Sequence, residues 1–391
     1  MRVTALAGDV PAALAAALAA RGVEPERADA LAAGGAPVAL LVEPLDDLAA
    51  AALVRGAARA GVDCHTGDGW AVVSGPLARL GGLARPAADA VLPERLSAAL
   101  GRFLQGRQEA PAGWRTARRT LPLERSCVVG ILNVTPDSFS DGGRHGTPDA
   151  ALAAAVAMCA AGADVIDVGG ESTRPGAARP EAEEELRRVV PVVRAVAETG
   201  VPVSVDTRRA AVAEAALAAG AEIVNDVSGL AADPGMAEVV RAAGAGVVVM
   251  HMRGDPHTMD ARASYRDVAA EVAAELAERR DAALAAGIPR EAVVLDPGLG
   301  FAKTTAHNLA LLDRLATITA LGHPVMVGPS RKRFLGAVTG RPVDRRDPAT
   351  AAACVAARLR GARLFRVHDV AAAREALAVA DAVLAEREGE A

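Results

Sequence analysis

An apolar run, a polar residue and a helix-forming stretch follow one another eight times between residue 128 and the C-terminus. The expected strands are Val128–Leu132, Asp164–Val168, Val201–Val205, Glu222–Val224, Val247–Met250, Ala292–Leu295, Pro324–Val327 and Leu364–Val367. Strands that alternate with helices pair in parallel, and eight such units close into a cylinder. The pattern therefore predicts an α/β chain with a (β/α)8 barrel of the TIM type. An open doubly wound sheet would rarely have so many evenly spaced units.

Residues 1–110 precede this pattern and mix short apolar runs with helical stretches. We predict that they form a small α/β N-terminal domain of unknown role, followed by a barrel over residues 111–391 that carries the active site. The expected N-terminal strands are Arg2–Leu6, Pro37–Val42 and Gly69–Val73, and the expected helices are Leu45–Ala60 and Pro93–Leu104. Trp114–Leu123 is expected to be a short lead-in that covers the bottom of the barrel.

The N-terminal segment offers one candidate metal site, because Cys64, His65 and Asp68 lie close together in the sequence. A stable site needs more ligands than these three, so an ordinary loop is the preferred interpretation. The four cysteines of the chain contain no Cys-x-x-Cys pair, which disfavours a disulfide framework and a zinc ribbon.

Charge and hydropathy narrow the possible partners. The net charge of −5 and the sequence pI near 5.9 argue against a nucleic-acid partner, since no basic face dominates. The apolar run Val10–Ala20 is too short to span a bilayer and lacks a basic leader, so no membrane partner is expected. We therefore expect a cytoplasmic protein that acts on small molecules.

Polar residues stand where each of the eight apolar runs ends. They are Asn133, Thr173 with Arg174, Asp206, Asn225, His251, Asp296, Lys332, and Arg366 with His368. The C-terminal ends of the strands carry the active site in (β/α)8 barrels. A buried polar group is costly unless it is hydrogen-bonded, so any one of these residues has a structural role as an equally good explanation. For the whole set that explanation is poor.

Asp206, Asn225 and Asp296 follow the third, fourth and sixth strands, and their side chains could converge across the barrel mouth. Two carboxylates beside an amide suit a flat heterocycle that presents an N–H and an amino edge. A metal site built from the same three residues is the alternative. It is less favoured because nearby His and Glu ligands are not evident.

A cationic group follows the last two strands, where barrels commonly bind phosphate. It comprises Arg331, Lys332, Arg366 and His368. Arg suits bidentate contact with phosphate oxygens, and Arg366 and His368 share one face of their strand. A surface ion pair remains an open alternative for Arg331 and for the neighbouring Arg333.

The first two loops complete the candidate site. Asn133 could bind a hard cation through its amide oxygen, with help from phosphate oxygens of a substrate. Residues 173–176, Thr-Arg-Pro-Gly, offer a cation that could face a carboxylate. The glycines of this loop and of Thr135–Gly146 predict two loops that order over the barrel mouth when substrates bind.

Together these stretches resemble the dihydropteroate synthase family. The resemblance rests on residues 130–143 (GILNVTPDSFSDGG), 167–176 (DVGGESTRPG), 204–207 (SVDT), 225–226 (ND), 250–252 (MHM), 258–259 (TM), 295–298 (LDPG), 300–301 (GF), Lys303, 330–332 (SRK) and 366–370 (RVHDV). It covers Trp114 to the C-terminus, and the ordered combination of motifs is highly specific. The N-terminal segment lies outside it.

The resemblance implies a condensation of 6-hydroxymethyl-7,8-dihydropterin diphosphate with p-aminobenzoate, giving 7,8-dihydropteroate and pyrophosphate in folate biosynthesis. It implies a pterin site of Asp206, Asn225, Met250, Asp296 and Lys332, and a diphosphate site of Asn133, Thr173, Arg366 and His368. It also implies a p-aminobenzoate site of Phe139, Thr173, Arg174, Pro175 and Phe301. Mg2+ on Asn133 is the implied cofactor, Asp206, Lys332, Arg366 and His368 are the implied catalytic residues, and a homodimer is the implied assembly.

The implied chemistry is a dissociative displacement, in which pyrophosphate leaves before the aniline nitrogen bonds. Two residues depart from the family pattern: Arg333 stands where many members carry Ser beside p-aminobenzoate, and Leu299, a mild apolar change, stands where Phe is frequent. The change at Arg333 bears on the contacts to p-aminobenzoate and on sulfonamide sensitivity, not on the class of reaction. Two rival functions remain: a non-catalytic paralogue that binds pterin diphosphate as a sensor or partner, and a pterin-dependent corrinoid methyltransferase.

Overall fold

A computed structural model of the chain describes residues 2–6, 39–74, 83, 100, 110–134, 148–171 and 180–388. The chain forms two compact units. One comprises residues 1–110 with 266–274 and 316–322, and the other comprises the remaining residues. The proposed division into domains at residues 110 and 111 stays a prediction.

A small antiparallel sheet with strand order β1-β2-β4-β3 forms the described part of the N-terminal segment. Its strands are β1 (Arg2–Leu6), β2 (Ala39–Glu43), β3 (Asp63–Gly67) and β4 (Trp70–Ser74), with helix α3 (Asp47–Ala60) after β2. The core includes Leu40, Leu53 and Val73, all fully buried. Asp46 caps α3 by accepting a hydrogen bond from the Ala49 N–H at 2.7 Å.

The predicted strands and first helix of this segment are confirmed to within two residues at most boundaries. The interpretation of Cys64 and His65 as loop residues is wrong, because both lie in β3 and pair with β4. The stretch has no apolar run that would predict a strand, because none of its side chains is fully buried. The buried residues of this hairpin belong to β4. The predicted helix Pro93–Leu104 lies outside the described residues apart from Leu100.

Eight parallel strands form the sheet of the second unit, in the order β12-β11-β10-β9-β8-β7-β14-β13. They are β7 (Cys127–Asn133), β8 (Val165–Gly169), β9 (Val203–Asp206), β10 (Ile223–Asp226), β11 (Gly246–Met250), β12 (Val293–Asp296), β13 (Met326–Val327) and β14 (Leu364–Val367). A single parallel bridge between Leu295 and Val325 joins β12 to the start of β13 and closes the ring. The predicted (β/α)8 barrel is confirmed.

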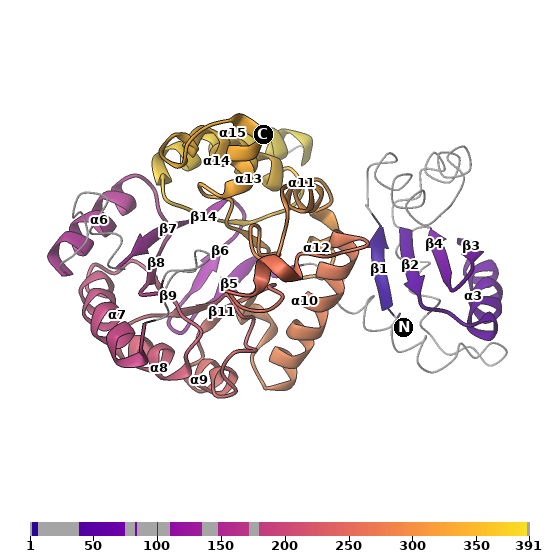
Figure 1. The fold of residues 1–391 in the computed structure, drawn as a ribbon, viewed down its shortest axis with the longest axis horizontal. Coiled ribbons are helices and arrows are strands. Elements are labelled where there is room, and N and C mark those ends of the chain that lie inside the picture. Colours follow the sequence, from indigo (N-terminus) through magenta and orange to yellow (C-terminus); the bar gives the residue numbers. More distant parts are fainter. Residues whose placement is uncertain are drawn as a thin grey trace. The chain divides into compact units, whose positions relative to one another are not determined.

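Helices follow the strands along the chain, and those from α6 to α9 with α14 and α15 surround the strands in Figure 1. They are α6 (Pro148–Ala160), α7 (Ala182–Ala197), α8 (Ala210–Ala219), α9 (Met236–Ala243), α10 (Val268–Ala285), α11 (Thr305–Asp313), α12 (Ala316–Thr319), α13 (Arg333–Thr339), α14 (Asp347–Arg358) and α15 (Val370–Glu388). Short 3-10 turns are η3 (Met259–Arg262), η4 (Arg290–Ala292) and η5 (Val343–Arg345).

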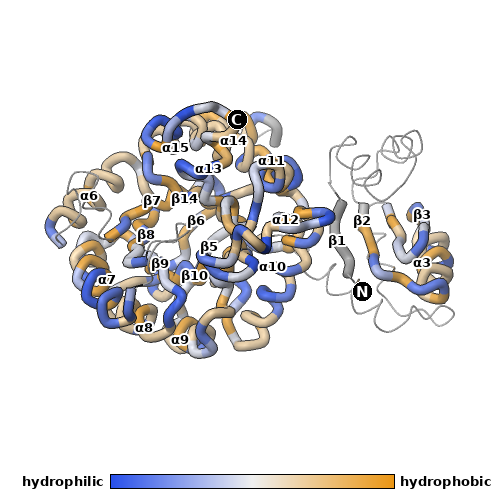
Figure 2. Tube along the Cα trace, viewed as in Figure 1, coloured by the Kyte–Doolittle hydropathy of each residue, from blue (hydrophilic) through white to orange (hydrophobic). Residues whose placement is uncertain are grey.

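Helix α7 illustrates how sequence places a helix on the barrel. Glu183 and Glu184 lie in its first turn, where a carboxylate is favoured by the helix dipole. Val189, Val193 and Val196 recur at helical spacing and are fully buried. Figure 2 shows the same division, with hydrophobic colouring along β7 and β14 and hydrophilic residues recurring along α7.

The bottom of the barrel is covered by a hairpin of β5 (Gly113–Arg115) and β6 (Thr120–Pro122), as predicted for the lead-in. Trp114 is 1% exposed, packs in one cluster with residues of seven barrel strands, and donates from Nε1 to the Ala292 carbonyl at 2.9 Å. A Cβ atom at Gly246 would come within 3.1 Å of the indole nitrogen. Because the β5–β6 hairpin and Trp114 fill this end, a ligand can enter the barrel only at the opposite end.

No helix within the described residues is long and apolar enough to cross a membrane.

Candidate active site

A pocket opens at the C-terminal ends of the strands, where the predicted pterin residues come together. Its walls are Asp206, Asn225, Val227, Met250, Asp296, Gly298, Leu299, Phe301, Met326, Gly328, Lys332 and Arg366. The empty space, including its open mouth, is about 390 Å³. All five residues predicted to hold the pterin ring line this pocket.

Arg366 connects the carboxylates at the base of the site. Its Nε donates to Oδ2 of Asp167 at 2.6 Å, and its Nη2 donates to Oδ2 of Asp206 at 2.7 Å. Asp167 also accepts from the Asn225 side-chain amide at 3.1 Å. Four strands, β14, β8, β9 and β10, therefore contribute to one buried network of charge-assisted hydrogen bonds.

Asp167 is the residue of this network that sequence reasoning left out of the site. It is fully buried in β8, two residues before the strand end, and its Oδ1 has no hydrogen-bond partner among the described residues. A rule that considers only the polar residues at the ends of apolar runs does not reach it. The signal that would have found it is an acid inside the run Val-Ile-Asp-Val, on the same face as Gly169.

The second carboxylate of the pocket, Asp296, is held by the loop that follows β12. Its Oδ1 accepts from the Gly298 N–H at 2.6 Å. Gly298 has φ +67, and a Cβ there would lie 2.0 Å from the His251 carbonyl oxygen, so the turn requires glycine. Beside it the Lys332 ammonium stands 3.9 Å from the centre of the Phe301 ring, a cation–π contact.

An apolar wall faces these charges. Val227, Met250, Met252, Met259, Phe301 and Ala302 form one buried cluster, and three of them also line the pocket. Such a site, with carboxylates on one side and apolar surface on the other, is suited to a flat ring that has a polar edge and an apolar face.

Burial shifts the pKa values of the charged groups in the pocket. Loss of solvation raises the pKa of Asp206 to about 7, although the Arg366 guanidinium opposes this and the Asp167 carboxylate adds to it. Burial likewise raises the pKa of Asp296 to about 6, against the hydrogen bond from Gly298. Burial and then Arg366 lower the pKa of Lys332 to about 8. The pocket thus holds groups that titrate within two pH units of neutrality.

The predicted cationic group divides into two. Lys332 and Arg366 line the pocket, whereas Arg331 forms a bidentate ion pair with Asp347 at 2.8 Å for each contact. Arg333 is exposed and pairs with Asp260 at 3.0 Å. Surface ion pairs, the alternative left open for Arg331 and Arg333, are what the structure contains.

His368 lies beside the pocket rather than on its wall. Ser330 Oγ and the His368 ring nitrogen Nδ1 are 2.8 Å apart, and the His368 N–H donates to the same hydroxyl at 3.1 Å. These bonds tie the loop after β13 to the end of β14. The predicted role of His368 at a diphosphate stays a prediction.

Asn133 ends β7 and its side chain is half-buried. A Cβ placed on Gly169 would lie 3.5 Å from both Asn133 Oδ1 and Asp206 Cβ, so this glycine leaves room between the amide and the pocket carboxylate. Phe139, Thr173, Arg174 and Pro175, four of the five residues predicted to contact p-aminobenzoate, lie outside the described residues. The fifth, Phe301, lines the pocket.

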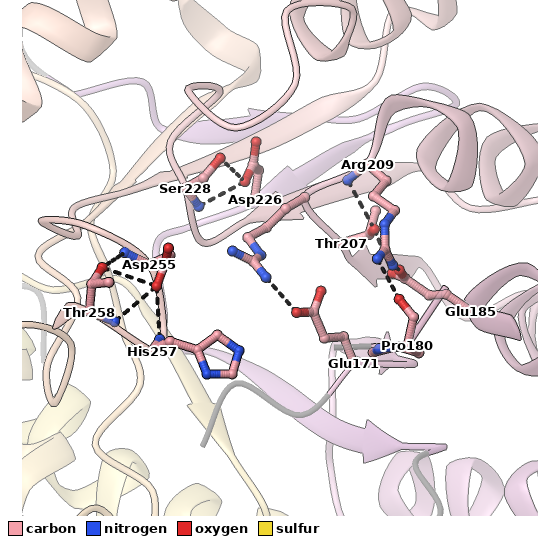
Figure 3. A network of polar contacts seen from close by, with 11 residues as sticks. Glu171, Pro180, Glu185, Thr207, Arg209, Asp226, Ser228, Asp255, His257 and Thr258 are labelled. Carbon is pink, nitrogen blue, oxygen red and sulfur yellow. Dashed lines mark hydrogen bonds and ion pairs between the residues drawn. The ribbon is translucent and has the colours of Figure 1, made fainter. Parts of the chain in front are cut away.

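Two ion pairs hold the residues on either side of segment 172–179, part of the network in Figure 3. Arg208 pairs with Glu171. Arg209 pairs with the fully buried Glu185 and donates to the Pro180 carbonyl. The Thr207 hydroxyl donates to Glu185 at 2.6 Å. The three residues that follow Asp206 thus anchor both flanks of the segment that carries the predicted Thr173, Arg174 and Pro175 contacts.

Comparison with known proteins places this site in a family. Residues 129–368 match the model of the pterin binding enzymes. A dihydropteroate synthase of Mycobacterium leprae is 52% identical over 264 residues, which are 66% of this chain and 93% of that protein. The Escherichia coli (strain K12) dihydropteroate synthase is 45% identical over 270 residues, 69% of this chain and 95% of that protein.

Solved structures give the same result. The structure of Xanthomonas albilineans dihydropteroate synthase with 4-aminobenzoic acid has a TM-score of 0.66 and 48% identity, covering 70% of this chain and 98% of that one. The Burkholderia cenocepacia dihydropteroate synthase complexed with 7,8-dihydropteroate has a TM-score of 0.65 and 43% identity, over 71% and 99% of the two chains. This chain is a pterin-binding (β/α)8-barrel enzyme, and within that family it belongs to the dihydropteroate synthases.

The position of Asp206 yields a prediction about its titration. In protein labelled with 13C at the aspartate carboxyl groups, one buried resonance should titrate near pH 7, while exposed aspartates titrate near 3.9. Arg366→Met should move that midpoint upward, because the guanidinium favours the charged carboxylate. NMR titration of both proteins makes the measurement, and a wild-type midpoint below about 5 would contradict the assignment.

Proposed function

We propose that this dihydropteroate synthase joins 6-hydroxymethyl-7,8-dihydropterin diphosphate to p-aminobenzoate, with the pterin ring in the pocket of Asp206, Asn225 and Asp296. The main support for this proposal is that these two carboxylates and one amide line a single pocket together with Lys332 and Met250. The related structures solved with 4-aminobenzoic acid and with 7,8-dihydropteroate support the same two substrates.

The pterin edge presents N–H and amino donors, and ionised carboxylates are their strongest partners. Asp206 and Asp296 accept from this edge, while the Asn225 amide is oriented by its bond to Asp167. Met250 and Val227 provide apolar contact to one face of the ring. Lys332, above the Phe301 ring, is placed to donate to ring acceptors.

The diphosphate lies toward Arg366, His368 and Asn133 in this proposal. Arg366 uses Nε and Nη2 for Asp167 and Asp206, and its Nη1 has no hydrogen-bond partner among the described residues, so it remains available for a phosphate oxygen. Asn133 offers one hard oxygen beside the space left by Gly169. An amide oxygen with phosphate oxygens and water is a suitable ligand set for Mg2+, which supplies charge neutralisation at the leaving group when bound.

The chemical step breaks the bond between the pterin methylene carbon and the diphosphate oxygen, and the electron pair leaves with pyrophosphate. Asp206 and Asp296 stabilise the positive charge that develops on the ring, and Arg366 stabilises the departing oxygens. The aniline nitrogen of p-aminobenzoate then bonds to the methylene carbon and loses a proton. The residues act by position and charge, without a covalent intermediate on the protein.

The p-aminobenzoate ring is placed against Phe301, with Phe139, Thr173, Arg174 and Pro175 of the first two loops as its other contacts. Phe301 is the one of these residues on the described pocket wall. Arg333, where many members carry Ser, is paired with Asp260 at the end of its side chain. The p-aminobenzoate site of this chain is therefore proposed to differ from the family pattern on that side.

The synthase activity is tested by incubating the protein with both substrates and Mg2+ and measuring dihydropteroate by mass spectrometry. Asp206→Asn should lower kcat/KM for the pterin substrate on the order of 10²- to 10³-fold, because a charged acceptor is lost from a buried site. The matched control is Asp226→Asn, which removes a buried carboxylate of β10 that bonds Ser228 and Leu230 outside the pocket.

Wild-type protein that binds the pterin diphosphate and releases no dihydropteroate would reject the synthase and favour the sensor paralogue. If Asp206→Asn and Asp226→Asn lost activity equally, the pterin pocket would be misplaced.

The role of Asn133 is tested with the metal itself. Asn133→Ala should raise the Mg2+ concentration required for half-maximal rate on the order of tenfold, the effect of one lost ligand, with little change in the affinity for a pterin that lacks phosphate. Rates measured against Mg2+ concentration and pterin binding measured by calorimetry give the two numbers. An unchanged Mg2+ requirement would place the ion on other groups.

We also propose a cytoplasmic homodimer. Leu359, Val379 and Val383 are 39%, 66% and 44% exposed on the packed pair α14 and α15, an apolar surface that a second copy could cover. The four cysteines are free, as in a reducing compartment. Sedimentation should give a dimer for the wild type and a monomer for the Val379→Asp, Val383→Asp double variant; a wild-type monomer would contradict the assembly.

A further inference from the structure

Lysine is almost absent from this chain, and both of its lysines lie at the active site. The sequence has 43 Lys and Arg residues, and only Lys303 and Lys332 are lysines. All of the remaining Lys and Arg positions are arginine, so primary amines occur on the side chains of these two residues alone. Lys332 lines the pocket and has a role there, whereas Lys303 does not line it.

Lys303 lies behind the pocket wall in a fully packed environment. It is 6% exposed, and its Nζ lies 3.0 Å from His251 Nδ1 and donates to the Phe301 carbonyl at 2.9 Å. The other nitrogen of the His251 ring, Nε2, lies 2.9 Å from Glu275 of α10. Arg253 pairs with the same Glu275, so the chain of contacts begins at an ion pair and ends at Phe301.

The protonation states agree with this direction of bonding. Burial and then the Lys303 charge lower the pKa of His251 to about 3, so the ring is neutral and its Nδ1 accepts from the amine while Nε2–H donates to Glu275. Burial lowers the pKa of Lys303 to about 7, partly offset by Asp296. An amine donates to both partners whether it is charged or neutral.

The loop that Lys303 closes carries part of the pocket wall. Leu299 and Phe301 line the pocket, and between Phe301 and Lys303 stands Ala302 with φ +51, a left-handed conformation that is strained for a residue other than glycine. The two bonds of the amine connect the end of this turn to the end of β11. They hold a strained turn in place from its buried side.

We propose that Lys303 is a positioning residue, which fixes Phe301 against the pocket and beneath the Lys332 ammonium through its bonds to His251 and the Phe301 carbonyl. The assignment of a catalytic consequence rests on the proposed function, because Phe301 is the wall placed against p-aminobenzoate. Arginine does not replace this amine, because its planar guanidinium is larger and stays charged in a space shaped for one nitrogen.

The scarcity of lysine makes the test direct. Protein labelled with 13C at the lysine ε-carbons gives two side-chain signals, and Lys303→Met removes one and thereby assigns the other to Lys332. In the wild type the Lys332 ε-protons should be shifted upfield by the Phe301 ring current, since the ammonium is 3.9 Å from the ring centre. Spectra at pH 6 keep the Lys332 amine charged.

In Lys303→Met the Lys332 signal should move more than half of the way to its position in Phe301→Leu, where the ring is absent. His323→Leu is the matched control. It removes a buried side chain that bonds the Val293 carbonyl of β12, the strand that precedes the loop of Lys303, and it should leave the Lys332 signal in place. A Lys332 signal that stays at the wild-type position in Lys303→Met would overturn the proposal. If Lys303→Met does not fold, Lys303→Gln takes its place with the same criterion.

Kinetics provide a second readout. Lys303→Met should raise KM for p-aminobenzoate on the order of ten- to a hundredfold while the pterin substrate KM stays near the wild-type value, as expected for a misplaced wall. An equal increase in both KM values together with a loss of thermal stability, as expected for a general packing defect, would also overturn the proposal. The NMR measurement requires no turnover. Absence of dihydropteroate would therefore reject the proposed function, while the NMR spectra would still test whether Lys303 positions Phe301.

Discussion

The cost of removing charge from water organises this active site. Asp167, Asp206 and Asp296 are buried where an isolated carboxylate would be neutralised, and each is stabilised by a fixed donor: Arg366 for the first two and the Gly298 N–H for the third. Because Arg366 of β14 bonds carboxylates of two other strands, β8 and β9, it also fixes the relative positions of groups in the proposed pterin site. Breaking one partner leaves a buried charge unpaired, so the members of the network depend on one another.

The barrel strands hold the members of this network at fixed positions. Trp114 and the β5–β6 hairpin fill the bottom, and parallel strands place Asp206, Asn225 and Asp296 at the same edge. The strand ends carry the charged groups of the pocket, whereas the loop residues Leu299 and Phe301 carry part of its apolar surface, and Lys303 bonds the Phe301 carbonyl from behind.

Much of this arrangement follows from the sequence, because the local pattern and the tertiary structure agree. Most of the barrel strands are runs of Val, Ile and Leu that hydrophobic patterning identifies, and the polar residues predicted at the ends of these runs include the five charged or amide side chains that line the pocket. Asp167 was missed because its position depends on strand parity and on Arg366, which lies 199 residues away. The ion pairs of Arg331 and Arg333 also depend on distant acids, so a basic run alone could not distinguish them from Lys332.

The ring of strands has one weak seam. β13 is two residues long and β12 is joined to it by a single bridge, whereas other neighbours share ladders of two to five residues. Asp296 lies on one side of that seam and Lys332 follows the strand on the other. A ring bound in the proposed pterin site would contact both residues and so add a connection across the weakest pairing of the barrel.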